Sequence, residues 1–181
     1  MRPLRLAPLF GVALATLTLT GCATMRVNSF VERGTNFTVY KTYSWAPAAQ
    51  LATGDPRLDN NEFFQERIQS AVEKGLGARG LEKAASGQID FVLHYHASVT
   101  QRVDAGGIDE KYGYCEDCTP SVFDAGTLTL DVVDARTNRL VWRGWAESTF
   151  DGVVDNQQWL ERQIDEAVNQ ILRRFPVGAR L

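Results

Sequence analysis

Two stretches of the 181-residue chain are apolar on one helical face only, and they restrict the fold more than any other feature. The stretch between Asp59 and Gly80 has an apolar residue at every fourth position, namely Phe64, Ile68, Val72 and Leu76. Residues 156–175 carry a second stripe, formed by Leu160, Ile164, Val168, Ile171, Leu172 and Phe175. A helix with one apolar face must bury it against another element. We therefore expect two helices on one face of a sheet.

The ends of both helices are marked in the sequence. Asp59 and Glu62 have the spacing of a capping box, with Asp in place of the usual Ser or Thr, and this predicts where the first helix begins. Gly80 fits its end. Pro176 prevents the second helix from continuing.

The strands are predicted from alternation and from β-branched and aromatic content. Residues 89–103 alternate cleanly, and residues 126–133 and 140–147 form a hairpin joined by 134–138. Residues 37–45 have the composition of a strand, and residues 25–31 are a weaker candidate. The order is β-β-α-β-β-β-α. The predicted fold is α+β, a two-layer sandwich with a largely antiparallel sheet of about five strands and two helices on one face.

The second hairpin strand has two different faces. One carries Leu140, Trp142, Gly144 and Ala146, and the other carries Val141, Arg143 and Trp145. Gly144 leaves room for a helix or a large side chain to approach. If the Trp142 face meets the helices, Arg143 and Trp145 lie on the uncovered face, where an aromatic beside an arginine is a typical interface pair. The alternative is that Trp145 packs against its own neighbours.

The first 22 residues have the pattern of a secretory signal. Arg2 and Arg5 precede an apolar run over 6–19, which is too short for a comfortable membrane span. The run ends in Leu19-Thr20-Gly21-Cys22, which resembles a bacterial lipobox. In lipoproteins of that type the signal is cut before the cysteine, whose thiol carries diacylglycerol and whose new amine is acylated. Several acyl chains hold a protein stably at a membrane, whereas one does not.

This pattern divides the chain. We expect a signal peptide over 1–21, a lipid-anchored tether over 22–26, one periplasmic domain over 27–176 and a tail over 177–181. By resemblance to lipoproteins of two-membrane bacteria, Ala23 instead of aspartate favours the outer membrane. The expected location is the outer membrane, facing the periplasm.

The charge balance argues against nucleic-acid binding. The chain has 19 Lys and Arg against 22 Asp and Glu, a net charge of −3, and loss of Arg2 and Arg5 makes the body more acidic still. A nucleic-acid-binding domain is expected to be basic.

Several of these pieces, in this order, match one family. They are the lipobox, Tyr40-Lys41-Thr42-Tyr43-Ser44-Trp45, the helix end Leu76-Gly77-Ala78-Arg79-Gly80-Leu81, the strand Asp90–His96, the hairpin Gly126–Ala146 and the terminal Phe175-Pro176. Together they resemble the bacterial envelope lipoproteins called domain of unknown function 4136, over about Val27 to Pro176. The resemblance implies a compact α+β domain in the periplasm, usually lipid-anchored. It implies no activity and no catalytic residues.

A loop of about 20 residues, 104–123, contains Tyr112, Tyr114, Cys115 and Cys118. Three interpretations of the cysteines remain open. A disulfide between Cys115 and Cys118 suits the oxidising periplasm and would stiffen the loop that carries the tyrosines. A thiol-redox site is a second, although Glu116 and Asp117 between the thiols oppose the low pKa that it needs. A zinc site with His94 and His96, which share a strand face, is the third.

No catalytic motif is found, whether a nucleophile elbow, a phosphate loop or paired histidines on a helix. The sequence favours a surface position or a turn for the carboxylates Asp131, Asp134, Glu147, Asp151 and Asp155. We expect no cofactor and a non-enzymatic lipoprotein that binds an envelope protein, lipid or glycan through Arg143, Trp145, Tyr112 and Tyr114. The alternatives are a metal-binding or thiol-redox accessory protein using Cys115, Cys118, His94 and His96, and a periplasmic hydrolase of no recognised type.

Overall fold

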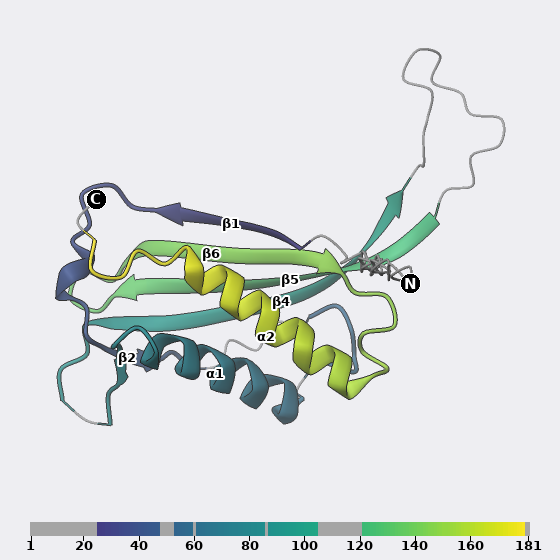
Figure 1. The fold of residues 1–181 in the computed structure, drawn as a ribbon, viewed down its shortest axis with the longest axis horizontal. Helices are drawn as coiled ribbons and strands as arrows, with labels where there is room; N and C mark the ends of the chain where they lie inside the picture. Colours follow the sequence, from purple (N-terminus) through teal and green to yellow (C-terminus); the bar gives the residue numbers. More distant parts are fainter. Residues whose placement is uncertain (1–24, 48–52, 60, 86, 105–120, 180–181) are drawn as a thin grey trace, which may run out of the picture.

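The computed structural model describes residues 25–47, 53–59, 61–85, 87–104 and 121–179. They form a two-layer α+β fold, as predicted (Figure 1). The elements are β1 (Arg26–Val31), the 3-10 helix η1 (Phe37–Val39), β2 (Thr42–Trp45), α1 (Glu62–Gly77), β3 (Glu82–Lys83), β4 (Phe91–Asp104), β5 (Ser121–Asp134), β6 (Arg139–Thr149) and α2 (Gln157–Arg173).

One six-stranded sheet has the order β1-β6-β5-β4-β2-β3. The pairs β1–β6, β6–β5 and β5–β4 are antiparallel, whereas β2 lies parallel to both β4 and β3. The sheet is therefore mixed and has one strand more than the expected five. The additional strand, β3, is only two residues long and both are exposed, so it has no alternation that a sequence could show.

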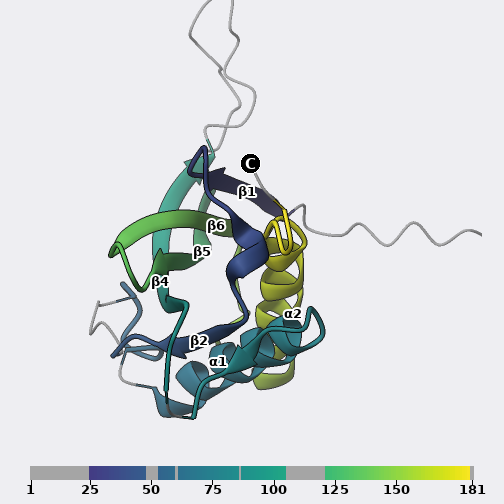
Figure 2. The same cartoon turned by 90° about the vertical axis from the view of Figure 1, so that its left-hand side faces the viewer.

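Both helices lie on the same side of the sheet (Figure 2). Helix α2 contacts β6, β1 and β5, and α1 packs against α2. Within the described residues, no helix has the length and apolar character needed to cross a membrane.

The predicted capping box of the first helix is wrong. Asn61, which directly precedes α1, caps the helix instead. Its side-chain oxygen accepts from the backbone N–H of Phe64 at 3.2 Å. The Asp59 carboxylate accepts from the backbone N–H and hydroxyl of Thr53 in the preceding loop. Helix α1 also ends at Gly77, three residues before the predicted Gly80, which adopts a φ of 75°.

The predicted strand over 37–45 begins later than expected. Asn36 accepts from the backbone N–H of Thr38 at 3.1 Å and so caps the short helix η1. Phe37, the first residue of η1, is buried beside Phe175 and Tyr40. Strand β2 starts only at Thr42.

The two longest strands extend past the edge of the sheet. Strand β6 pairs with β5 only as far as Thr149 opposite Ala125, yet β4 and β5 remain paired up to Asp104 opposite Ser121. This two-stranded arm projects from the body (Figure 1) and exposes Val103 and Val122. The predicted loop over 104–123 is therefore partly strand at both ends, and residues 105–120 lie outside the described part of the chain.

Asp90 joins the beginning of β2 to the beginning of β4. Its Oδ2 accepts from the backbone N–H groups of Lys41 at 2.8 Å and Thr42 at 2.9 Å, and from the Thr42 hydroxyl at 3.1 Å. Partial burial raises the pKa of Asp90, but these hydrogen bonds outweigh it and hold the pKa below its ordinary value. The charged carboxylate is therefore the form that the fold favours.

We expect Asp90→Asn to lower the free energy of unfolding at pH 7 by about 1–2 kcal/mol. Because the folded-state pKa is depressed, the carboxylate stabilises the protein above the unfolded-state pKa, and this contribution is lost as the pH falls through the folded-state pKa. The difference between the two proteins should therefore shrink in acid. Urea denaturation at pH 7 and at pH 3 measures it, and an equal difference at both would contradict the assignment.

Candidate functional site

The sheet face opposite the helices carries most of the polar side chains of the central strands. Cross-strand register arranges them in three rows: His94, Asp131, Arg143, Phe30; then His96, Thr129, Trp145, Asn28; then Ser98, Thr127, Glu147, Arg26. Because side chains alternate along a strand, these rows lie on the other face of the sheet from Leu93, Leu130 and Trp142, which belong to the buried core. We call these three rows, together with Thr100 and Arg102 at the next two even positions of β4, the open face. No helix of the described residues lies on it (Figure 2).

A bidentate ion pair lies at the centre of the open face. Arg143 donates from Nε to Asp131 Oδ1 at 2.6 Å and from Nη2 to Asp131 Oδ2 at 2.5 Å. The Asp131 side chain is only 7% exposed, whereas that of Arg143 is 45% exposed. Hydrogen bonding to Asp131 raises the pKa of Arg143. The guanidinium is thus fixed in position while nearly half of the Arg143 side chain faces solvent.

Asp131 was predicted to be a surface or turn residue, and that prediction is wrong. It is 5% exposed, although it points away from the helices. It lies between His94 and Arg143 in register, so the side chains of two neighbouring strands cover it. The sequence offered one signal. Asp131 directly follows Thr129 and Leu130 in the middle of an alternating strand, and aspartate is uncommon within strands.

The open face carries charges of both signs. A second ion pair joins Arg102 Nη2 to Glu147 Oε2 at 2.7 Å. The face thus carries the arginines Arg26, Arg102 and Arg143 against the carboxylates of Asp131 and Glu147, with two histidines beside them.

Trp145 occupies the row next to Arg143, on the open face, as its position in the strand predicted. It is partly exposed. Asn28 and Thr129 lie opposite it on the two neighbouring strands. Val141 departs from the predicted pattern: a register shift between Val132 and Val133 makes it an extra residue in β6, and it is buried instead of sharing the face of Arg143.

His94 and His96 share the open face, as predicted. His96 Nε2 lies 3.8 Å from Asp131 Oδ2, and His96 Nδ1 is buried with no hydrogen-bond partner among the described residues. Within those residues, no three His, Cys, Asp or Glu side chains gather as a metal-binding group. Cys115 and Cys118, the other members of the proposed zinc set and of the proposed disulfide, lie outside the described residues, as do Tyr112, Tyr114 and Cys22.

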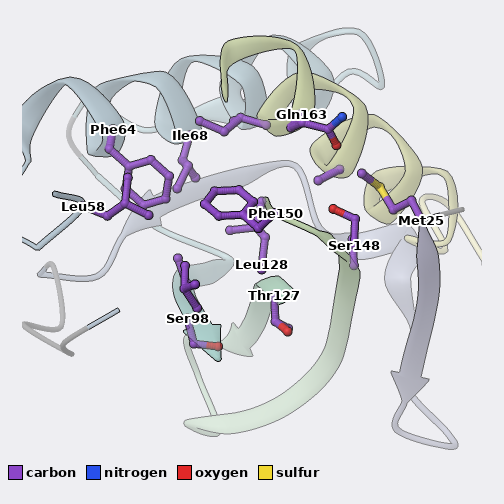
Figure 3. A pocket seen from close by; sticks show the side chains of 16 residues that line it. Met25, Leu58, Phe64, Ile68, Ser98, Thr127, Leu128, Ser148, Phe150 and Gln163 are labelled. Carbon is purple, nitrogen blue, oxygen red and sulfur yellow. The ribbon is translucent and has the colours of Figure 1, made fainter. Parts of the chain in front are cut away.

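A small apolar cavity lies between the helices and the inner sheet face (Figure 3). Its volume is about 50 Å³, and its walls include Leu58, Phe64, Ile68, Leu128 and Phe150. An engineered cavity that binds benzene is about 150 Å³. The space is therefore a packing gap of the core, too small for a ligand of that size.

A polar groove lies at the other end of β1, beside the β5–β6 turn. Its volume is about 320 Å³, and it is lined by residues that include Arg33, Tyr40, Asp134 and Arg136. The Tyr40 hydroxyl donates to Asp134 Oδ2 at 2.9 Å, while Asp134 Oδ1 accepts from the backbone N–H of Thr137 at 2.7 Å. These groups hold the turn, which supports the predicted turn position of Asp134.

The model of a protein family described as a domain of unknown function, DUF4136, matches residues 27–177. The chain belongs to this family. The match covers every helix and strand except the first residue of β1. It confirms the family resemblance of the sequence motifs. No curated protein sequence matches the chain significantly.

The chain is similar to solved structures of low sequence identity. A PDZ domain protein from Parabacteroides distasonis is 15% identical with a TM-score of 0.58, over 84% of this chain and 36% of that one. This DUF4136 chain thus spans about a third of that protein. A PelC dodecamer from Paraburkholderia phytofirmans is 16% identical with a TM-score of 0.48, over 87% of this chain and 100% of that one. At 15% identity, the likeness to the Parabacteroides distasonis protein shows the fold alone.

Proposed function

We propose that this protein is a non-enzymatic lipoprotein, anchored through Cys22 in the outer membrane and facing the periplasm, whose open face binds another envelope protein. The observation that carries the proposal is Arg143, held by the buried Asp131, next to Trp145 on a sheet face that no helix of the described residues covers. Arginine and tryptophan are the side chains most often found at the energetic centres of protein interfaces. The lipobox at Cys22 supports the location.

A protein partner fits this face better than a lipid or glycan does. The guanidinium is prepositioned, so little side-chain entropy is lost when it binds. Its Nη1 takes no part in the bonds to Asp131 and can donate to a partner, for which a carboxylate is a matching acceptor. Lipid and glycan partners are the alternative outcomes of the experiment below.

We expect Trp145→Ala to reduce in-cell crosslinking of the full chain to its partner by about tenfold or more, since a tryptophan at an interface centre contributes 2 kcal/mol or more. The crosslinked species are identified by mass spectrometry. Trp159→Ala is the matched control, because Trp159 is 41% exposed on α2, away from the open face. Equal capture by Trp145→Ala and wild type would contradict the assignment of this face.

Arg143→Lys and Cys22→Ala separate the parts of the proposal. Arg143→Lys keeps the charge but loses the bidentate contact to Asp131, so it should also weaken capture. Cys22→Ala should move the chain from the membrane to the soluble fraction. A membrane-bound Cys22→Ala protein would contradict the anchor but not the binding face, and crosslinks to lipid or glycan alone would replace the protein partner.

A further inference from the structure

Strand β1 lies at one edge of the sheet, and its outer side has no strand partner among the described residues. The backbone N–H of Glu32 donates to the Val141 carbonyl at 2.9 Å, which continues the β1–β6 register by one residue. In an antiparallel ladder, the backbone N–H and C=O groups of every second residue bond to the neighbouring strand. The backbone groups of the residues between them point away from that strand. Since Glu32 bonds inward, the N–H and C=O groups of Val27, Ser29 and Val31 point away from β6.

The Ser29 backbone supports this assignment. Its N–H is bonded by the side-chain oxygen of the adjacent Asn28 at 3.1 Å, and not by a group of β6. An unpaired edge is a template for another strand, and proteins usually protect it with lysine, proline or a bulge. Strand β1, Arg-Val-Asn-Ser-Phe-Val, has neither lysine nor proline, and its pairing with β6 has no register shift.

The edge is complementary to itself. If two copies of β1 pair antiparallel about Ser29, Val27 of each lies opposite Val31 of the other, and Arg26 lies opposite Glu32. Arg26 and Glu32 are six positions apart, so they share a sheet face and meet as opposite charges at both ends of the pair. All three outward residues of each copy take part in this pairing. They form three facing pairs, and each pair makes two backbone hydrogen bonds.

We propose that β1 pairs with β1 of a second copy of this chain, antiparallel about Ser29, so that two six-stranded sheets join into one. The register is set by the backbone and the charges together. Pairing about Asn28 would bring the inward residue Asn28 to the axis and Arg26 opposite Phe30, which leaves both charges without a partner. Pairing about Phe30 would leave Val27 unpaired.

The existing contact of Glu32 does not compete with this pairing. Glu32 Oε1 is bonded by Arg139 Nη2, and Oε2 has no partner among the described residues. Arg26 makes no ion pair with a described residue. Both groups are thus available to a second copy.

Ser29→Pro is the decisive variant. Proline removes the outward N–H that the second copy would use, whereas the monomer does not use it for the sheet. Ser29→Ala, which keeps the N–H, is the matched control. Native mass spectrometry and sedimentation of the full chain in nonionic detergent should show a dimer for wild type and Ser29→Ala. For Ser29→Pro we expect a dissociation constant at least about tenfold higher, because the hydrogen bonds at the axis are lost.

Charge reversal tests the register without changing the backbone. Arg26→Glu places like charges opposite each other at both ends of the pair and should weaken the dimer about tenfold. Arg26→Glu with Glu32→Arg restores opposite charges and should recover it. A monomeric wild type, a Ser29→Pro protein that dimerises as strongly as wild type, or a double variant no better than Arg26→Glu would each overturn the proposal.

Discussion

Replacing Trp142 by alanine is expected to lower the free energy of unfolding by about 3–5 kcal/mol, the range for a fully buried large aromatic. Trp142 is 0% exposed on the inner face of β6. Its ring packs edge to face against that of Phe175, with 4.9 Å between the ring centroids. It also fills the space above Gly144. Its loss would leave a cavity at the point where β6 meets the C-terminal end of α2.

Trp142→Phe separates the volume of the ring from its polar group. The indole Nε1 is buried with no hydrogen-bond partner among the described residues. Phenylalanine removes that unsatisfied donor as well as part of the ring, so we expect it to cost clearly less than alanine. Urea denaturation followed by far-UV circular dichroism measures both variants. A loss below about 1 kcal/mol for Trp142→Ala would show that this end of the core is loosely packed.

Gly144→Val is expected to destabilise the protein by about 3 kcal/mol, at the upper end of the range for overpacked cores. A Cβ atom at Gly144 would lie 2.4 Å from the Trp142 ring and 2.7 Å from Ile171 Cγ2. Both neighbours are fully buried, so neither can move into solvent. This close approach confirms what the glycine within the alternating strand predicted.

Gly77→Ala is the matched control for Gly144→Val. Nothing lies within 4 Å of a Cβ atom at Gly77, and its backbone is helical, so alanine should stabilise the protein slightly. A Trp142→Ala, Gly144→Ala double variant adds a second check. Because Trp142→Ala removes the ring that the new methyl group would meet, the two losses should not add. Additive losses would place the clash elsewhere.

The fold could be predicted because its periodicities are strong. All six residues of the stripe expected in the second helix are buried, although Phe175 lies two residues beyond the end of α2. The long strands β4, β5 and β6 are each predicted by alternation. Local competition caused the errors. Asn61 caps α1 later than predicted, and Asn36 caps η1 where a strand was expected over 37–45. Val141 adds a residue to β6 that simple alternation places on the wrong face.

The candidate site could be predicted only in part. Arg143 and Trp145 were assigned to the open face from strand alternation alone. The role of Asp131 was missed, because its burial depends on side chains from β4 and β6 that meet it only through register. The free edge was missed as well, since which groups of β1 point outward is decided by its pairing with β6.

The position of β1 also determines how the domain responds to force. The chain enters the sheet through β1, whose only strand partner among the described residues is β6. A pull along the strand, applied ahead of Arg26, loads all the β1–β6 hydrogen bonds at once because these bonds run perpendicular to the strands. A pull across the sheet opens them one after another, beginning at Arg26. The domain should therefore resist tension along β1 and yield by peeling when it is pulled sideways.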